Sequence, residues 1–89
     1  MSRILIKGAE EALAQNTANA KIFSNAKLVR VVNTNAAAQL VTLVASVGGS
    51  VIGSFTLASG DSVELEKEPL NGIFAADATV KASPIGYTQ

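Results

Sequence analysis

Residues 50–67, SVIGSFTLASGDSVELEK, contain two runs in which apolar and polar residues alternate, separated by the turn-forming residues Ala58–Asp61. In the second run Val63 and Leu65 fall on one face of a strand, and the serine and glutamates between them fall on the other, because successive strand side chains point to opposite faces. The residues of the first run that share a face are Val51, Phe55 and Leu57. The pattern predicts two antiparallel strands joined by a short turn.

Similar short runs continue on both sides of this pair. The further expected strands are Leu28–Val32, Gln39–Val44, Ile73–Ala75, Ala78–Ala82 and a last one through Ile85 and Tyr87. Short links between them favour antiparallel pairing, because a parallel crossover needs about a dozen residues or more. We therefore expect an all-β fold: a single antiparallel β-sandwich of six or seven short strands, immunoglobulin-like or small and barrel-like, over residues 27–89.

The organisation changes N-terminal to residue 27. Arg3–Lys7 has the pattern of a short strand, and Ala9–Gln15 is rich in helix-favouring residues with two acids near its start, which favours a short helix. Residues 16–26 show no sustained period and offer Ile22 and Phe23 as apolar anchors. We expect residues 1–26 to form an extended arm or edge element that is ordered mainly by what it contacts.

Composition limits the classes of partner. The 89 residues allow one domain, and seven basic and seven acidic residues cancel, which disfavours nucleic acid as a partner. Only 16% of the residues are charged, so much of the surface must be neutral, as expected for a protein that is covered by neighbours. No segment has the length of a membrane span or of a signal-peptide core, and we expect neither membrane insertion nor export.

The charges are divided along the chain. Residues 1–45 carry five basic and two acidic residues (5 − 2 = +3), and residues 46–89 carry two basic and five acidic residues (2 − 5 = −3). Such a division favours head-to-tail or arm-to-body contacts between copies, since complementary potentials orient an encounter. Chance combined with ordinary solvation is the alternative explanation.

Residue types suited to catalysis are scarce. The chain has no histidine and no cysteine, which excludes imidazole acid–base chemistry, Ser-His-Asp and Cys-His nucleophiles and thiolate metal sites. Glu64, Glu66 and Glu68 would share one strand face and could hold Ca²⁺ or act as a glycosidase-like carboxylate pair, but a solvated outer face is the simpler interpretation. The glycines of 48–53 precede a strand rather than a helix, which favours a hairpin over a phosphate loop. We expect no enzyme activity, cofactor or metal, with a hydrolase acting through serine and lysine as a remote alternative.

Several segments carry a resemblance to a known group of proteins. They are Leu28–Asn33, Gly53–Pro69, Ile73–Ala75 and Val80–Tyr87, in the order of an apolar strand, an Ala-Ser-Gly-Asp turn, an alternating strand, Glu-Lys-Glu-Pro, and a terminal Val-Lys-Ala strand. In this the chain resembles small virion structural proteins of tailed phages of cyanobacteria and marine bacteria. The resemblance implies a capsid decoration (cement) protein, made in the host bacterial cytoplasm and located on the capsid exterior.

The same resemblance implies the partners. They would be the major capsid protein and further copies of the chain, as a homo-oligomer such as a trimer. The expected partner-binding residues are Arg3, Ile4, Leu5, Ile6, Lys7, Ile22 and Phe23. An alternative is a tail, neck or baseplate accessory or receptor-binding module, with its site in the loops at one end of the sandwich.

Overall fold

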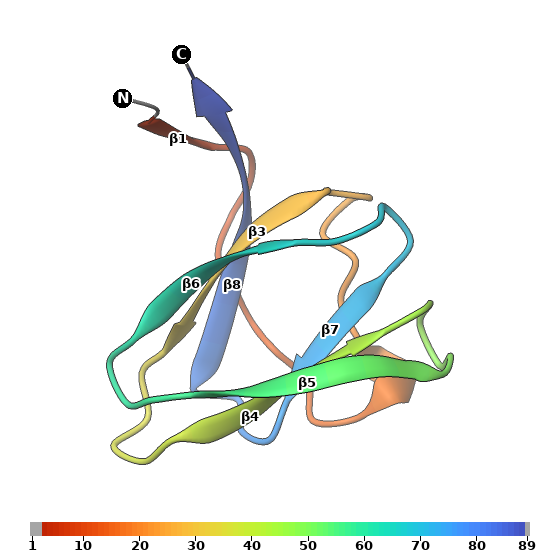
Figure 1. Cartoon of the computed structure of the whole chain (residues 1–89), viewed down its shortest axis with the longest axis vertical. Helices are drawn as coiled ribbons and strands as arrows, with labels where there is room; N and C mark the ends of the chain where they lie inside the picture. Colours follow the sequence, from red (N-terminus) through yellow and green to blue (C-terminus); the bar gives the residue numbers. More distant parts are fainter. Residues whose placement is uncertain (1–2, 89) are drawn as a thin grey trace.

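The computed structural model describes residues 3–88 and has an all-β architecture (Figure 1). Its elements are β1 (Arg3–Ile6), β2 (Glu11–Ala12), the 3₁₀ turn η1 (Thr17–Asn19), β3 (Leu28–Asn33), β4 (Gln39–Val44), β5 (Val51–Leu57), β6 (Ser62–Glu66), β7 (Gly72–Ala75) and β8 (Val80–Thr88). The strands form two antiparallel sheets, one in the order β1-β8-β3-β6 with β2 also paired to β8, the other in the order β5-β4-β7. The expected antiparallel β-sandwich is confirmed, and within residues 3–88 the sheets do not close into a barrel.

The core lies between the two sheets. β3 is central in its sheet, pairing with β6 on one side and β8 on the other, and its Val29 and Val31 are fully buried. The cluster of buried apolar residues consists of Leu13, Phe23, Val29, Val31, Val41, Leu57, Ile73, Ala75, Val80 and Ala82. The expected strands contribute most of this core because their alternation places every second residue inside.

A buried amide connects the two sheets at the end of β3. Asn33 is 0% exposed; its Nδ2 donates to the carbonyls of Leu57 and Ala37 at 2.9 and 3.0 Å, and its Oδ1 accepts from the backbone N–H of Asn35 at 2.9 Å. Leu57 ends β5 in the other sheet, so this side chain holds the corner between the layers. An amide can be buried there because its hydrogen-bonding groups are satisfied.

A register shift changes the face expected for β5. Between Leu43 and Val44 of β4 the pairing with β5 shifts, so that Leu43 lies opposite Gly53 and Val44 opposite Val51. Beyond the shift Val51 is 62% exposed, whereas Leu57 at the other end is 3% exposed. The expectation that Val51 shares the inner face of Phe55 and Leu57 is therefore wrong, because one extra residue in a strand reverses the faces beyond it.

The expected helix at Ala9–Gln15 is also wrong. Glu11 and Ala12 pair with Ala82 and Lys81 of β8, and the backbone N–H of Leu13 donates to the carbonyl of Val80 at 2.9 Å. Leu13 is 1% exposed and belongs to the core. Helix propensity is a weak preference, and here the burial of one leucine beside an open strand edge outweighs it.

Residues 13–26 pack against the sandwich and do not form a separate arm. Lys21 exchanges backbone hydrogen bonds with Ile73 of β7 at 2.9 and 3.0 Å, and its Nζ lies 2.9 Å from the carboxylate of Glu11. Ala20 and Phe23 are each 6% exposed. The expected division at residue 26 thus does not coincide with a boundary in the packing, since the chain on both sides of it shares one core.

A buried lysine fastens this segment to the body. Lys67 is 5% exposed, and its Nζ donates to the carbonyl oxygens of Ile22, Pro69 and Glu68 at 3.0, 3.3 and 3.4 Å. Burial away from water lowers the pKa of the Lys67 amino group below its ordinary value of 10.5. The ammonium group uses its three donors on backbone carbonyls, and so joins residue 22 to the link between β6 and β7.

Candidate assembly interface

A two-stranded ribbon projects from the sandwich. It consists of β1 and residues 85–88 of β8, paired in the register Arg3↔Thr88, Ile4↔Tyr87, Leu5↔Gly86 and Ile6↔Ile85. Figure 1 shows β1 and the end of β8 extending beyond the body. β3 pairs with β8 only as far as Val29↔Pro84, so the ribbon continues beyond the sheet that supports it.

Both edges of the ribbon are open among the described residues. Lys7 donates its backbone N–H to Pro84 at 2.9 Å, so in an antiparallel ladder the backbone groups of Lys7 and Leu5 face β8, and those of Ile4 and Ile6 face away. On the other side, residues 85–88 extend past β3 without a partner strand within residues 3–88. Open edges of this kind accept strands from other chains.

The side chains on this edge are apolar and accessible. Ile4, Leu5 and Ile6 are 41%, 44% and 74% exposed. Many proteins protect an open strand edge with charged residues, proline or a covering segment, but among residues 4–7 and 85–86 the one charged residue is Lys7. Three consecutive exposed apolar residues on an open edge mark a contact surface.

A local detour in the chain separates the ribbon from the body. Pro84 has no N–H to donate towards β1, and residues 8–10 are not paired with β8 at that point, between the pairs Ile6↔Ile85 and Glu11↔Ala82. A Cβ atom at Gly8 would lie 2.9 Å from Cγ of Pro84, so glycine is needed for the close approach. The two strands expected at Ala78–Ala82 and through Ile85 and Tyr87 are instead one strand, β8, which accommodates Pro84.

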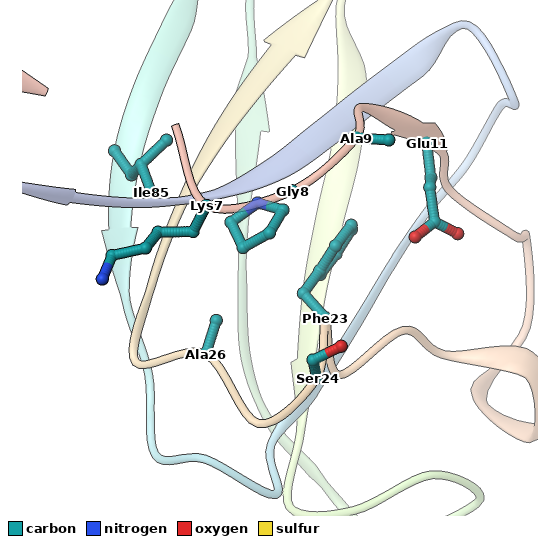
Figure 2. A pocket seen from close by; sticks show the side chains of 9 residues that line it. Lys7, Gly8, Ala9, Glu11, Phe23, Ser24, Ala26 and Ile85 are labelled. Atoms are coloured by element: carbon teal, nitrogen blue, oxygen red, sulfur yellow. The ribbon is translucent and has the colours of Figure 1, made fainter. Parts of the chain in front are cut away.

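Two open pockets flank the base of the ribbon. One, of about 330 Å³, lies under the detour, and Figure 2 shows Lys7 and Glu11 at its opposite ends with Phe23 and Ser24 below. The other, of about 470 Å³, is lined by Ile4, Ile6, Gly8, Ala9, Glu10, Arg30, Ser83 and Ile85. The second pocket thus borders the exposed side chains of Ile4 and Ile6.

The left-handed turn Phe23–Asn25 forms one wall of the first pocket. Its three residues have φ values of 54°, 55° and 63°, a conformation that costs roughly 1–2 kcal/mol for each non-glycine residue. The turn directs the Phe23 ring into the core, where it is 6% exposed. Phe23 was expected to bind a partner; it is instead a core residue, because the tight turn reverses the chain over the end of the sandwich.

The structure thus separates the expected partner-binding residues into two places. Arg3–Lys7 lie in and directly after β1, although the side chain of Arg3 is outside the described part of the structure. Ile22 is half-buried, and its carbonyl is bound by Lys67. The segment that remains available for a partner is therefore Ile4–Lys7.

A second open edge, which the sequence pattern does not predict, lies at the opposite side of the same sheet. β6 pairs only with β3 among the described residues, and Lys67 N–H to Lys27 and Asn33 N–H to Asp61 (2.8 and 3.0 Å) set its register. By alternation the backbone groups of Ser62, Glu64 and Glu66 face outward. The sequence signal for this edge is the alternation of Glu64, Glu66 and Glu68, which by itself indicates a solvated face, a cation site or a carboxylate pair.

The other candidate sites have structural explanations. In the part of the chain that the structure describes, no group of three or more acidic, histidine or cysteine side chains is arranged to hold a metal ion. The glycine turn at 48–49 is a hairpin in which Gly48 donates to the carbonyl of Thr17 at 2.7 Å. None of the helical residues described here forms a segment long and apolar enough to cross a membrane.

Comparison of this chain with protein-family models, curated proteins and solved structures gave no match. Among the residues that the structure describes, the features that indicate a function are the ribbon, the open edges of β1 and β6, and the residues that line them.

Proposed function

We propose that this chain is a structural component of a tailed-phage virion: a decoration protein that binds the major capsid protein lattice on the outside of the head and stabilises it. The observation that carries the proposal is the ribbon, an apolar β element that projects from the body and has open edges. The virion setting comes from the sequence resemblance of residues 28–33, 53–69, 73–75 and 80–87. In this role the chain acts by binding and not by catalysis.

Strand addition is the mode of attachment that the ribbon suits. The outward N–H and C=O groups of Ile4 and Ile6 can form hydrogen bonds with an open edge, while side chains on the two faces enter separate apolar contacts. Backbone hydrogen bonds supply affinity for almost any partner sequence that offers an open strand edge. Specificity for one partner comes from the side chains of Ile4, Leu5 and Ile6, which point alternately to the two faces of the strand.

The energies indicate a weak individual contact. Covering the remaining exposed area of an isoleucine or leucine contributes about 1 kcal/mol, since full burial contributes about 1.5–3 kcal/mol. Each backbone hydrogen bond adds about 0.5–1.5 kcal/mol, and association costs about 4–15 kcal/mol in lost freedom. One ribbon alone therefore binds weakly, and firm attachment requires many copies or several contacts per copy, which a repeating lattice provides.

Particle composition tests the proposal. In particles purified from a lytic culture of the phage that carries this coding sequence, quantitative mass spectrometry should find many copies in a fixed ratio to the major capsid protein. A few to a few dozen copies per particle would assign the chain to the tail, neck or baseplate instead. Absence of the chain from purified particles would overturn a virion role altogether.

An edge-blocking variant tests the ribbon itself. Ile6→Pro removes an N–H that faces away from β8, so it should preserve the β1–β8 pairing and abolish co-sedimentation with particles lacking the native chain. Ile6→Val is the matched control, because it keeps the donor and the apolar face. If Ile6→Pro attaches as well as Ile6→Val, the ribbon is not the attachment element.

A further inference from the structure

The two open edges of the larger sheet carry opposite charge. β1 is followed by Lys7, and residues 1–9 contain no acid. β6 and its flanks contain Asp61, Glu64, Glu66 and Glu68, which are all exposed. Since β1 and β6 are the two ends of the order β1-β8-β3-β6, one molecule presents a basic apolar edge at one side of the sheet and an acidic edge at the other.

Pairing like edges of two copies with full overlap of residues 3–7, or of residues 62–66, would bring like charges together. A symmetric β1–β1 pair centred on Leu5 places Lys7 of one copy opposite position 3 of the other, which is arginine. A symmetric β6–β6 pair centred on Glu64 places its carboxylates together. Like charges directly opposite each other on neighbouring strands are destabilising. The edge strand β5, residues 51–57, contains no charged residue, so it has no carboxylate that could pair with Lys7.

Pairing unlike edges satisfies both the charges and the alternation. In a parallel pair, a residue whose backbone groups face the partner strand lies opposite one whose groups face away. Ile4 and Ile6 of β1 can then lie opposite Val63 and Leu65 of β6, which are half-buried against the core. The same register places Leu5 opposite Glu64 and Lys7 opposite Glu66, so that apolar residues meet apolar residues on one face and the two charges meet on the other.

We propose that the open edge of β1 pairs in parallel with the open edge of β6 in a second copy of this chain, in the register Ile4–Val63, Ile6–Leu65 and Lys7–Glu66. This inference deepens the proposed function, on which it rests for the use of the ribbon as an attachment element: the strand edge that the ribbon enters belongs to a neighbouring copy. The contact joins two different surfaces, so a pair of copies leaves a β1 edge free on one copy and a β6 edge free on the other. Further copies can bind at these edges, and assembly continues to a ring or chain.

Sedimentation of the full chain tests the stoichiometry. The weight-average mass should rise with concentration past that of a dimer, because a head-to-tail contact does not close at two copies. A mass that stays at the monomer, or a plateau at the dimer, would overturn the proposal.

Charge exchange tests the register. Lys7→Glu and Glu66→Lys should each weaken self-association about tenfold, a factor that corresponds to about 1.4 kcal/mol. The double variant carrying both changes should recover it to within about threefold of the native chain, as opposite-charge pairs on neighbouring strands require. Ala38→Glu, which adds an acid on the exposed β3–β4 turn outside both edges, is the control and should have no effect. A double variant no better than the single ones would overturn the Lys7–Glu66 pairing.

Edge-blocked variants test the two-surface geometry. Ile6→Pro blocks the β1 edge and Glu66→Pro blocks the β6 edge, each by removing an outward N–H. Each variant alone should be monomeric, with circular dichroism unchanged, and an equimolar mixture should give a one-to-one dimer and nothing larger. Larger species from the mixture, or no complex at all, would contradict the model.

The same variants separate this inference from the proposed function. If the native chain is monomeric and Ile6→Pro still abolishes particle binding while Glu66→Pro does not, the ribbon attaches to the capsid alone and the inference fails. If the chain self-associates as described but is absent from particles, the virion role fails and the edge pairing stands.

Discussion

Two segments of the N-terminal region place their apolar residues in opposite positions. Ile4–Ile6 is an apolar run whose side chains are 41–74% exposed, whereas Leu13, Ala20 and Phe23, a few residues later, are 1–6% exposed. Ile4–Ile6 pairs with the end of β8 where no other layer within residues 3–88 faces it. Leu13 and Phe23 instead pack into the core between the two sheets. The comparison teaches that hydrophobicity alone does not place a segment inside a small sandwich; a facing layer is also needed.

The largest expected effect compares two leucines of these segments. Leu13→Ala should lower the free energy of unfolding by about 2–5 kcal/mol, because it opens a cavity in the core. Leu5→Ala, at a 44% exposed position, should change it by no more than about 0.5 kcal/mol. Chemical denaturation of both variants measures the difference. Equal losses would mean that the ribbon is as much part of the core as residue 13.

The Lys67 contacts allow the attachment of residues 13–26 to be weakened without touching the ribbon. Lys67→Met should cost about 1–3 kcal/mol, because the carbonyls of Ile22 and Pro69 lose the donor that binds them. Amide exchange at Ile73, which bonds to Lys21, should accelerate, while the β1–β8 amides keep their native protection. Lys27→Met, at an exposed position, is the control and should leave both quantities near native. Faster exchange in β1 would show that the two segments are coupled.

The left-handed turn offers a stabilising change in the buried segment. Ser24 has φ 55°, and Ser24→Gly should raise the free energy of unfolding by about 0.5 kcal/mol, since the relief of roughly 1–2 kcal/mol is partly offset by the greater freedom of glycine when unfolded. Ser62→Gly in the extended strand β6 should instead be destabilising. Thermal unfolding can compare the two, and a loss at position 24 would contradict the argument.

The smallest effect concerns stability at acidic pH, which should depend on Asp77 in the sandwich and not on the ribbon. The backbone N–H and then the hydroxyl of Thr79 hold the pKa of Asp77 below its ordinary value of 3.8. A lowered folded pKa means that the contribution to stability is present above 3.8 and is lost as the pH falls through the depressed value. Asp77→Asn should therefore show a smaller decrease in melting temperature between pH 6 and pH 2.5 than the native chain. An identical decrease in both would show that Asp77 does not contribute to the loss of stability at low pH.

Local patterns predicted the strands well, and failed where distant partners decide. Alternation and turn residues predict β4, β5 and most of β3 and β6. A neighbouring turn or link in each case determines which side chains of the strand face the core. The segment Ala9–Gln15 gave a wrong helix because its partner, β8, lies about seventy residues further along the chain and no local signal announces it. The burial of Phe23 likewise depends on three left-handed residues that are serine, asparagine and phenylalanine rather than glycine.

The candidate interface was predictable only in part. Residues 3–7 were identified from an apolar run with flanking charges, a pattern that a protruding ribbon and an ordinary edge strand share. Neither the protrusion nor the open edge of β6 follows from the sequence, since both depend on where β3 stops pairing with β8. The acidic residues of β6 were visible throughout, but their complement at Lys7 becomes apparent only when both strands are the two ends of one sheet.

The pairing of Arg3 with Thr88 has a practical consequence for anyone handling this molecule. An affinity tag or fluorescent fusion joined at Arg3 or Thr88 would lie beside the open edges of the ribbon and would obstruct them. An insertion at the exposed hairpin Val47–Gly48, or a circular permutant joined across residues 88 and 3 and reopened there, would leave those edges unencumbered. Binding assays with end-tagged protein would underestimate the attachment.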